Sequence, residues 1–144
     1  MKITEVRVKL VHNNCQKENK KLRAFAWITF DNLLVVSDLR IIEGAKSLFV
    51  AMPNRKIADH CLRCGNKNPL LNHYCGNCGC NLDEDRQNSD INSCKRFYAD
   101  IVHPIDPNCR DMIHKAVLNE YFNERELAKQ PGYVSKYCEW GEWK

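Results

Sequence analysis

The fold is decided by residues 22–42, which read LRAFAWITFDNLLVVSDLRII. Aromatic, β-branched and other apolar residues dominate both residues 22–30 and residues 33–42, and this composition favours strands. Asp31 and Asn32 separate the two runs and suit a two-residue hairpin turn, because both side chains tolerate a positive φ. The stretch therefore predicts a β-hairpin.

Further strands extend this hairpin on both sides. Apolar residues alternate with basic residues over positions 6–10, as in a half-buried strand. Residues 48–52 are apolar and stop at Pro53, which cannot donate to a strand ladder. After a long polar stretch, residues 97–102 form a candidate fifth strand. The sequence thus predicts an antiparallel meander of four to five strands.

A helix is expected after the last strand. Asp106 can cap its N-terminus, and Pro107 suits its first position. The apolar residues that follow share one face of a 3.6-residue period: Met112, Ile113, Ala116, Val117 and Tyr121. This C-terminal helix would cover the sheet, so the predicted fold class is α+β.

A single helix covers only one face of a sheet, yet apolar residues lie on both faces of the central strands. In residues 22–30, Phe25 and Trp27 point to one face, and Ala24, Ala26, Ile28 and Phe30 point to the other. We expect a second copy of the chain to cover this face, which makes the protein a homodimer. The alternative is a β-bulge that turns the apolar residues onto one face.

Residues 57–95 have a different composition from the rest of the chain. Asn, Cys, Gly and Asp dominate, and large apolar side chains are few, so this stretch needs a cross-link to become ordered. We interpret it as an insertion into a discontinuous α+β domain of residues 1–56 and 96–128. Residues 129–144 read as a C-terminal tail.

The insertion carries two C-x2-C-G motifs. Cys61 and Cys64 form the first motif, and Cys75 and Cys78 form the second. A two-residue spacing lets both sulfur atoms reach one tetrahedral ion at about 2.3 Å, and the following Gly lets backbone amides turn toward the thiolates. Four thiolates complete a structural site. The motifs therefore predict a zinc-ribbon-like unit that holds Zn²⁺ through these four cysteines.

Two alternatives stay open for this site. Cys80, His60 or His73 could replace one of the four ligands. A similar spacing holds a single iron ion in rubredoxin-like proteins, which would make the site a redox carrier. Zinc ranks first because structural four-thiolate sites are mostly zinc sites.

Six segments outside the insertion carry a family resemblance: residues 1–8, 24–31, 37–44, 48–53, 100–105 and 116–121. They resemble the stage V sporulation protein G (SpoVG) family, most specifically over residues 38–53 and the His-Pro-Ile segment 103–105. Members of that family are small dimeric α+β proteins that bind DNA and RNA and are linked to septation and sporulation. The resemblance implies a nucleic-acid-binding regulator here.

Basic residues bracket the insertion and are candidate phosphate contacts. Arg55 and Lys56 precede it, and Lys95 and Arg96 follow it, so the two pairs should lie close together in space. Arg110 falls in the expected first turn of the helix, beside amides that favour anions. We predict that these five residues form the nucleic-acid-binding surface.

Other classes of function fit less well. A protein-interaction module would use the zinc-ribbon-like unit and the tail residues Trp140 and Trp143, since tryptophan is a frequent interface anchor. We expect no enzyme, because the sequence has no phosphate-binding glycine loop, paired carboxylates or nucleophile motif. The 144 residues carry a net charge of +4 and are 44% hydrophobic, with no membrane-spanning run and no signal-peptide core. A cytoplasmic location is therefore expected.

Overall fold

The computed structural model describes residues 1–11, 21–83, 86 and 96–135. The chain divides into two compact units, Met1–Pro53 with Val102–Lys144 and Asn54–Ile101, which we call the sheet–helix unit and the cysteine unit. The sequence analysis had placed residues 54–56 and 96–101 in the larger domain. The boundaries differ because these two segments pair with each other in a separate ribbon.

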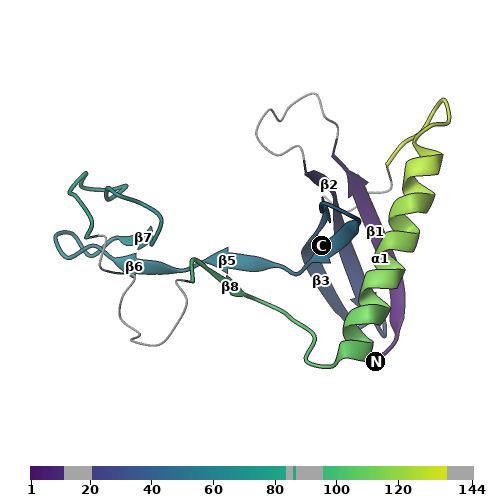
Figure 1. Ribbon diagram of the computed structural model, residues 1–144, viewed down its shortest axis with the longest axis horizontal. Coiled ribbons are helices and arrows are strands. Elements are labelled where there is room, and N and C mark those ends of the chain that lie inside the picture. Colours follow the sequence, from purple (N-terminus) through teal and green to yellow (C-terminus); the bar gives the residue numbers. More distant parts are fainter. Residues whose placement is uncertain (12–20, 84–85, 87–95, 136–144) are drawn as a thin grey trace. The chain divides into compact units, whose positions relative to one another are not determined.

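The sheet–helix unit is built on four antiparallel strands. They are β1 (Ile3–Leu10), β2 (Leu22–Phe30), β3 (Leu34–Glu43) and β4 (Leu48–Ala51), which neighbour one another in chain order (Figure 1). Asp31 and Asn32 both have positive φ, and the Leu33 amide donates to the Phe30 carbonyl at 2.9 Å. The predicted meander and its hairpin turn are confirmed.

One helix, α1 (Pro107–Leu127), lies along one face of this sheet (Figure 1). Its N-cap is Asp106, whose carboxylate accepts a hydrogen bond from the Asn108 amide at 3.3 Å. Pro107 occupies the first helical position, where its missing N–H costs nothing. The predicted α+β class and the predicted start of the helix are confirmed.

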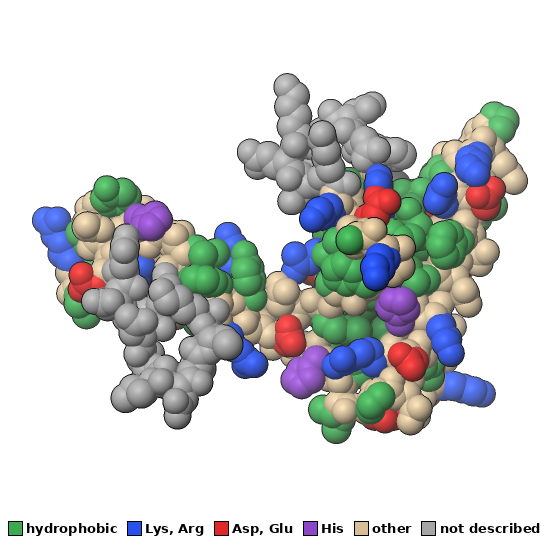
Figure 2. Space-filling model, in the orientation of Figure 1, with side chains coloured by type: hydrophobic (Ala, Val, Ile, Leu, Met, Phe, Trp, Pro, Cys, Tyr) green, Lys and Arg blue, Asp and Glu red, His purple; other side chains and the backbone are tan. Residues whose placement is uncertain are grey.

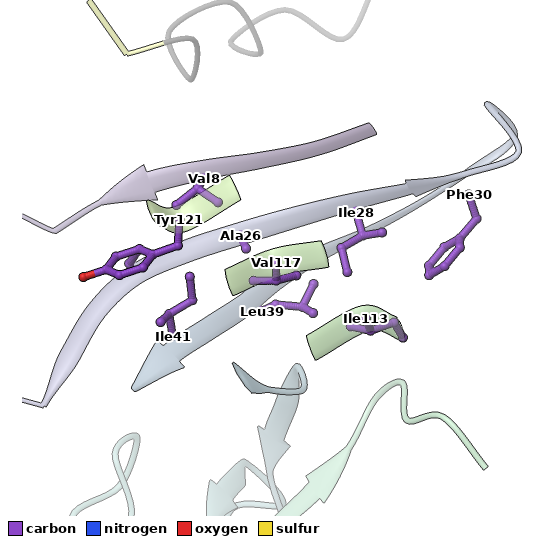
Figure 3. Packing of buried hydrophobic residues seen from close by; sticks show 10 residues of the cluster. Val8, Ala26, Ile28, Phe30, Leu39, Ile41, Ile113, Val117 and Tyr121 are labelled. Carbon is purple, nitrogen blue, oxygen red and sulfur yellow. The ribbon is translucent and has the colours of Figure 1, made fainter. Parts of the chain in front are cut away.

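The core of this unit lies between the helix and the sheet. Strand side chains point toward the helix in Figure 3, and the buried apolar residues are Val8, Ala24, Ala26, Ile28, Phe30, Leu39, Ile41, Ile113, Val117 and Tyr121. The strands precede the cysteine unit in the chain, and the helix follows it. The core therefore joins two segments that the insertion separates in sequence.

A β-bulge explains why β3 has apolar residues at both odd-numbered and even-numbered positions. Ala26 faces Leu39 and Ile28 faces Val36, so two residues of β3 stand opposite the single residue Trp27. The bulge keeps both Val36 and Leu39 against the core, although they are three positions apart. In β2 the strict alternation persists, and Phe25 and Trp27 lie half-buried on the face opposite α1. The second copy of the chain expected on that face stays a prediction.

The cysteine unit begins and ends in a two-stranded ribbon. Strand β5 (Asn54–Lys56) pairs antiparallel with β8 (Tyr98–Asp100), and the expected fifth strand is thus present but belongs to this ribbon instead of the four-stranded sheet. Strand β6 (Ala58–His60) then pairs with β7 (Lys67–Pro69). The paired strands bring the entry and exit of the unit together.

Candidate metal centre

Each C-x2-C-G motif forms a tight loop closed by the same hydrogen bond. The Gly65 amide donates to the Cys61 carbonyl at 2.8 Å, and the Gly79 amide donates to the Cys75 carbonyl at 3.0 Å. Both glycines have positive φ, 73° and 70°, which strains any residue with a side chain. The two motifs therefore fold as a matched pair of loops, as the sequence predicted from their glycines.

The four predicted cysteines lie together. All sulfur atoms of Cys61, Cys64, Cys75 and Cys78 are within 4.8 Å of one another. The Cys64–Cys75 sulfur distance is 3.6 Å, and the Cys61–Cys78 distance is 3.8 Å. A tetrahedral ion with metal–sulfur bonds of about 2.3 Å requires sulfur–sulfur distances of about 3.8 Å. The cluster could thus hold one metal ion through four thiolates.

Backbone amides approach the first sulfur of each loop. The Arg63 amide lies 3.4 Å from Cys61 Sγ, and the Asn77 amide lies 3.4 Å from Cys75 Sγ. Hydrogen bonds from the backbone amides of Cys78 and Asn77 lower the pKa of Cys75 to about 6. Such amides stabilise a thiolate, the form that binds a metal.

In the second loop, neighbouring sulfur atoms affect the pKa of Cys78. The Cys80 amide lowers the pKa of Cys78, but the Cys80 thiol, burial and the nearby thiols of Cys64 and Cys61 raise it to about 12. Neighbouring negative charges oppose one another, so these thiols cannot all ionise unless a cation compensates them. The pKa values of Cys75 and Cys78 thus shift in opposite directions, and a cation at the cluster would stabilise the thiolate form of both residues.

Asn68 is a site residue that the sequence analysis missed. Asn68 is 2% exposed, and both the nitrogen and the oxygen of its side-chain amide form hydrogen bonds. Its Nδ2 donates to Cys75 Sγ at 3.3 Å and to the Asn66 carbonyl at 2.9 Å, while its Oδ1 accepts from the Gly76 amide at 2.9 Å. Asn68 therefore ties β7 to the second loop and orients a ligand sulfur. In a segment rich in Asn, the sequence gives no signal that singles it out.

The alternative ligands occupy other positions. His60 Nδ1 is hydrogen-bonded to the Gly65 carbonyl at 2.9 Å, so it supports the first loop from outside. Within the described part of the chain, neither His60 nor His73 joins the four-sulfur cluster. Cys80 Sγ lies 3.2 Å from Cys61 Sγ without being a member of that cluster. The four-cysteine set remains the one suited to a tetrahedral ion.

The β5–β8 ribbon brings three of the five predicted basic residues together. Arg55 and Lys56 are exposed on β5, and exposed Arg96 directly precedes the segment that pairs with it, where the Ile57 amide donates to the Phe97 carbonyl at 2.8 Å. Figure 2 shows Lys and Arg side chains at the surface of this ribbon. Lys95 lies outside the described residues.

Arg110 belongs to the other unit. It sits in the first turn of α1, where its amide donates to the Asp106 carbonyl at 3.1 Å. The structure thus gathers Arg55, Lys56 and Arg96 in the cysteine unit and assigns Arg110 to the sheet–helix unit.

Known proteins resemble this chain over most of its length. The SpoVG family model matches residues 1–123. Relatives named septation protein SpoVG include one from Finegoldia magna, 34% identical over 126 residues that cover 88% of this chain and 79% of the relative. One from Clostridium perfringens is 31% identical over 130 residues, covering 90% of this chain and 99% of the relative. One from Borrelia garinii is 31% identical over 124 residues, covering 86% and 89%.

Fold and site together define an α+β protein in which a four-stranded sheet and its helix host a four-cysteine unit able to hold a metal. The chain belongs to the SpoVG family. In the described residues, no helix has the length and apolarity to cross a membrane.

Proposed function

We propose that this chain is a cytoplasmic nucleic-acid-binding regulator whose cysteine unit is held by a structural zinc ion. The proposal is of a binding protein, not an enzyme. The relatives carry the name septation protein, and we propose a role in septation or sporulation for this chain as well.

The proposal that the chain binds nucleic acid rests on which residues stand opposite each other in the β5–β8 ribbon. Lys56 stands opposite Tyr98, and Arg55 stands opposite Ala99. Opposite residues share one face of a ribbon, so an aromatic ring lies beside a cation. Cations can contact phosphates, aromatic rings can stack on bases, and a two-stranded ribbon fits a major groove. Arg96 adds a third positive charge close by.

The proposal of a structural zinc ion is supported by two features: the sulfur atoms have near-tetrahedral spacing, and the four cysteines suffice to fill the coordination sphere. Four cysteines leave no open position for substrate, as in structural sites. Zinc and iron form thiolate sites of the same shape, so metal analysis must separate them. Purified protein should contain about one zinc per chain and be colourless, whereas iron would give visible thiolate-to-metal absorption.

We further propose that two copies pair through the sheet face that carries Phe25 and Trp27. Both side chains are half-buried on the side opposite α1. Sedimentation at micromolar concentration should give a dimer, and Trp27→Ala should weaken it. A wild-type chain that sediments as a monomer would contradict the proposed dimer, but not the proposed nucleic-acid binding or zinc site.

A second candidate function is a protein-interaction module. Leu62, at the tip of the first loop, is 95% exposed, and Tyr74 beside the second loop is 66% exposed. Exposed apolar residues at the tips of a rigid unit are suitable anchors for a partner protein. Trp140 and Trp143, which the sequence analysis also assigned to this role, lie outside the described residues.

The deciding experiment measures the affinity for single-stranded RNA and duplex DNA at several salt concentrations. Arg55→Gln, Lys56→Gln and Arg96→Gln should each weaken binding, and each lost phosphate contact should reduce the log-affinity versus log-salt slope by about 0.7–0.9. Arg110→Gln tests the helix position separately. Lys46→Gln, at an exposed turn before β4, is the charge-matched control. Unchanged affinity and slope in the triple variant with its metal retained would favour the interaction module.

A further inference from the structure

A fifth thiol lies against the four-sulfur cluster. Cys80 Sγ is 3.2 Å from Cys61 Sγ, closer than the 3.6 Å and 3.8 Å that separate the Cys64–Cys75 and Cys61–Cys78 sulfur pairs. It is also closer than the edge of about 3.8 Å that a tetrahedral metal–thiolate site needs. Cys80 is therefore placed to react with a ligand sulfur, not to share the metal equally.

The two thiols differ in their access to solvent. Cys61 is 3% exposed and packs with Cys75 and Leu82, whereas Cys80 is partly exposed and packs against that cluster from outside. A small oxidant from solvent thus reaches Cys80 more readily than Cys61. Cys64 is exposed as well, but it is one of the four candidate metal ligands. Oxidation of a thiol follows both its accessibility and its thiolate character, and the resulting sulfenic acid condenses with a nearby thiol.

We propose that Cys80 is an oxidation site that releases the metal by forming a disulfide with the ligand Cys61. The oxidant is of the peroxide class, and the inference rests on the metal centre of the proposed function. The pairing with Cys61 is favoured by distance, because the two sulfur atoms need to approach by only about 1.2 Å to reach the disulfide length of about 2.0 Å.

The chemistry balances in two steps. The Cys80 sulfur first attacks one peroxide oxygen, the O–O bond breaks, and the products are Cys80 sulfenic acid and one water. The Cys61 sulfur, a thiolate in the loaded site, then attacks the Cys80 sulfur and displaces hydroxide, which takes up a proton from solvent and leaves as a second water. The two cysteine sulfurs lose two electrons in total, and hydrogen peroxide is reduced to two waters.

The consequence for the metal follows from the ligand count. A disulfide sulfur no longer carries the thiolate charge that binds the ion, so only three cysteines of the cluster remain as ligands. The metal is lost, and with it the cross-link of the cysteine unit. A thiol reductant should reverse the reaction and allow the metal to bind again.

The experiment uses the full chain loaded with zinc and treated with hydrogen peroxide. Zinc release is followed with a chromogenic chelator, and disulfides are mapped by mass spectrometry after trypsin digestion. Trypsin cuts after Lys56, Arg63, Lys67 and Arg86, so Cys61 lies in peptide 57–63 and Cys80 shares peptide 68–86 with Cys75 and Cys78. Fragment ions of the cross-linked pair must therefore assign the bond to Cys80. The cross-linked pair of these peptides should form in step with zinc release, and reduction should separate it.

Matched variants assign the reaction to Cys80. Cys80→Ser should keep the zinc content of the wild type, lose the cross-linked peptides and slow zinc release at least severalfold. Cys109→Ser, which removes a thiol from the other unit, should behave as the wild type. The role of Cys80 would be refuted if Cys80→Ser released zinc at the wild-type rate, or if that variant lost zinc before oxidation. Neither result would refute the proposed metal centre. A wild-type chain that binds no metal would overturn the proposed metal centre as well.

Discussion

The two units of this chain are stabilised in different ways. In the sheet–helix unit, Ile28, Leu39, Ile41 and Val117 are almost completely buried in one apolar core. In the cysteine unit, the buried cluster consists of two cysteines and Leu82, with Cys78 and Cys80 packed against it. The first unit follows the usual rule that apolar burial offsets the entropy of folding, whereas the second is too poor in apolar residues for that rule to suffice.

The difference teaches how a small domain can accept an insertion of this size. The β5–β8 ribbon pairs Asn54 with Asp100, so the inserted chain leaves and returns at one place. The inserted unit carries its own four-sulfur cluster, and none of its described residues belongs to the apolar core of the host. Each unit should therefore respond to its own perturbations and not to those of the other.

The largest effect is expected from removing a metal ligand. Cys75→Ser should abolish metal binding and unfold the cysteine unit, because binding of a structural zinc contributes about 10–16 kcal/mol to the folding of small zinc domains. The helix signal in circular dichroism should remain, since α1 belongs to the other unit. Elemental analysis and limited proteolysis measure both effects, with Cys109→Ser as the control. Loss of the helix signal together with the metal would refute independent units.

The converse perturbation acts on the apolar core. Ile28→Ala leaves a cavity between β2 and α1 and should lower the free energy of unfolding of the sheet–helix unit by about 2–5 kcal/mol. Denaturant titration at constant metal content measures the change. Leu33→Ala, at an 89% exposed turn position, should change it by less than about 0.5 kcal/mol. A lower zinc affinity in Ile28→Ala would show that the units are coupled.

A smaller effect is expected from the residue that supports a ligand. Asn68→Ala removes the hydrogen bonds to Cys75 Sγ and the Gly76 amide and should weaken zinc affinity about 10–100-fold. Competition with a chelator of known affinity measures this change. Asn77→Ala is the matched control, because Asn77 contributes its backbone amide to Cys75 Sγ. Equal affinities for the two variants would contradict the role of Asn68.

The smallest effect concerns the start of α1. Asp106→Ala removes the cap of the Asn108 amide and should cost about 1 kcal/mol of stability in the sheet–helix unit. Thermal unfolding measures it, and Asp111→Ala removes the same charge from an exposed position within the helix. If Asp111→Ala is as destabilising as Asp106→Ala, charge and not capping is responsible.

Periodic features of this fold could be predicted from the sequence, because a half-buried strand or helix imposes a period on its apolar residues. Strand β1 and the apolar face of the helix were found in this way. Strands β2, β3 and β4 were found from their apolar composition, and the Asp31–Asn32 turn and the helix start from the local chemistry of turns and caps. The pairing of β5 with β8 was missed as a separate ribbon, because strands of three residues are too short to show a period. The sequence analysis offered a bulge only as an alternative to a second copy of the chain. The position of a bulge depends on the pairing register with the neighbouring strand, which one strand's sequence does not show.

The metal-binding cysteines could be predicted for a different reason. Their spacing is fixed locally by the geometry of one ion, so Cys61, Cys64, Cys75 and Cys78 were identified without knowledge of the fold. Asn68 and the approach of Cys80 to Cys61 depend on how β7 and the second loop pack, which no local spacing records.

The most direct test of the two-unit account is hydrogen exchange measured by mass spectrometry on the wild-type chain, with zinc bound and after chelation. The account predicts that chelation removes protection from residues 54–83, including the amides of Gly65 and Gly79. Protection of β2, β3 and α1 should stay unchanged. Loss of protection in both units, or full protection of the cysteine unit without metal, would contradict the account.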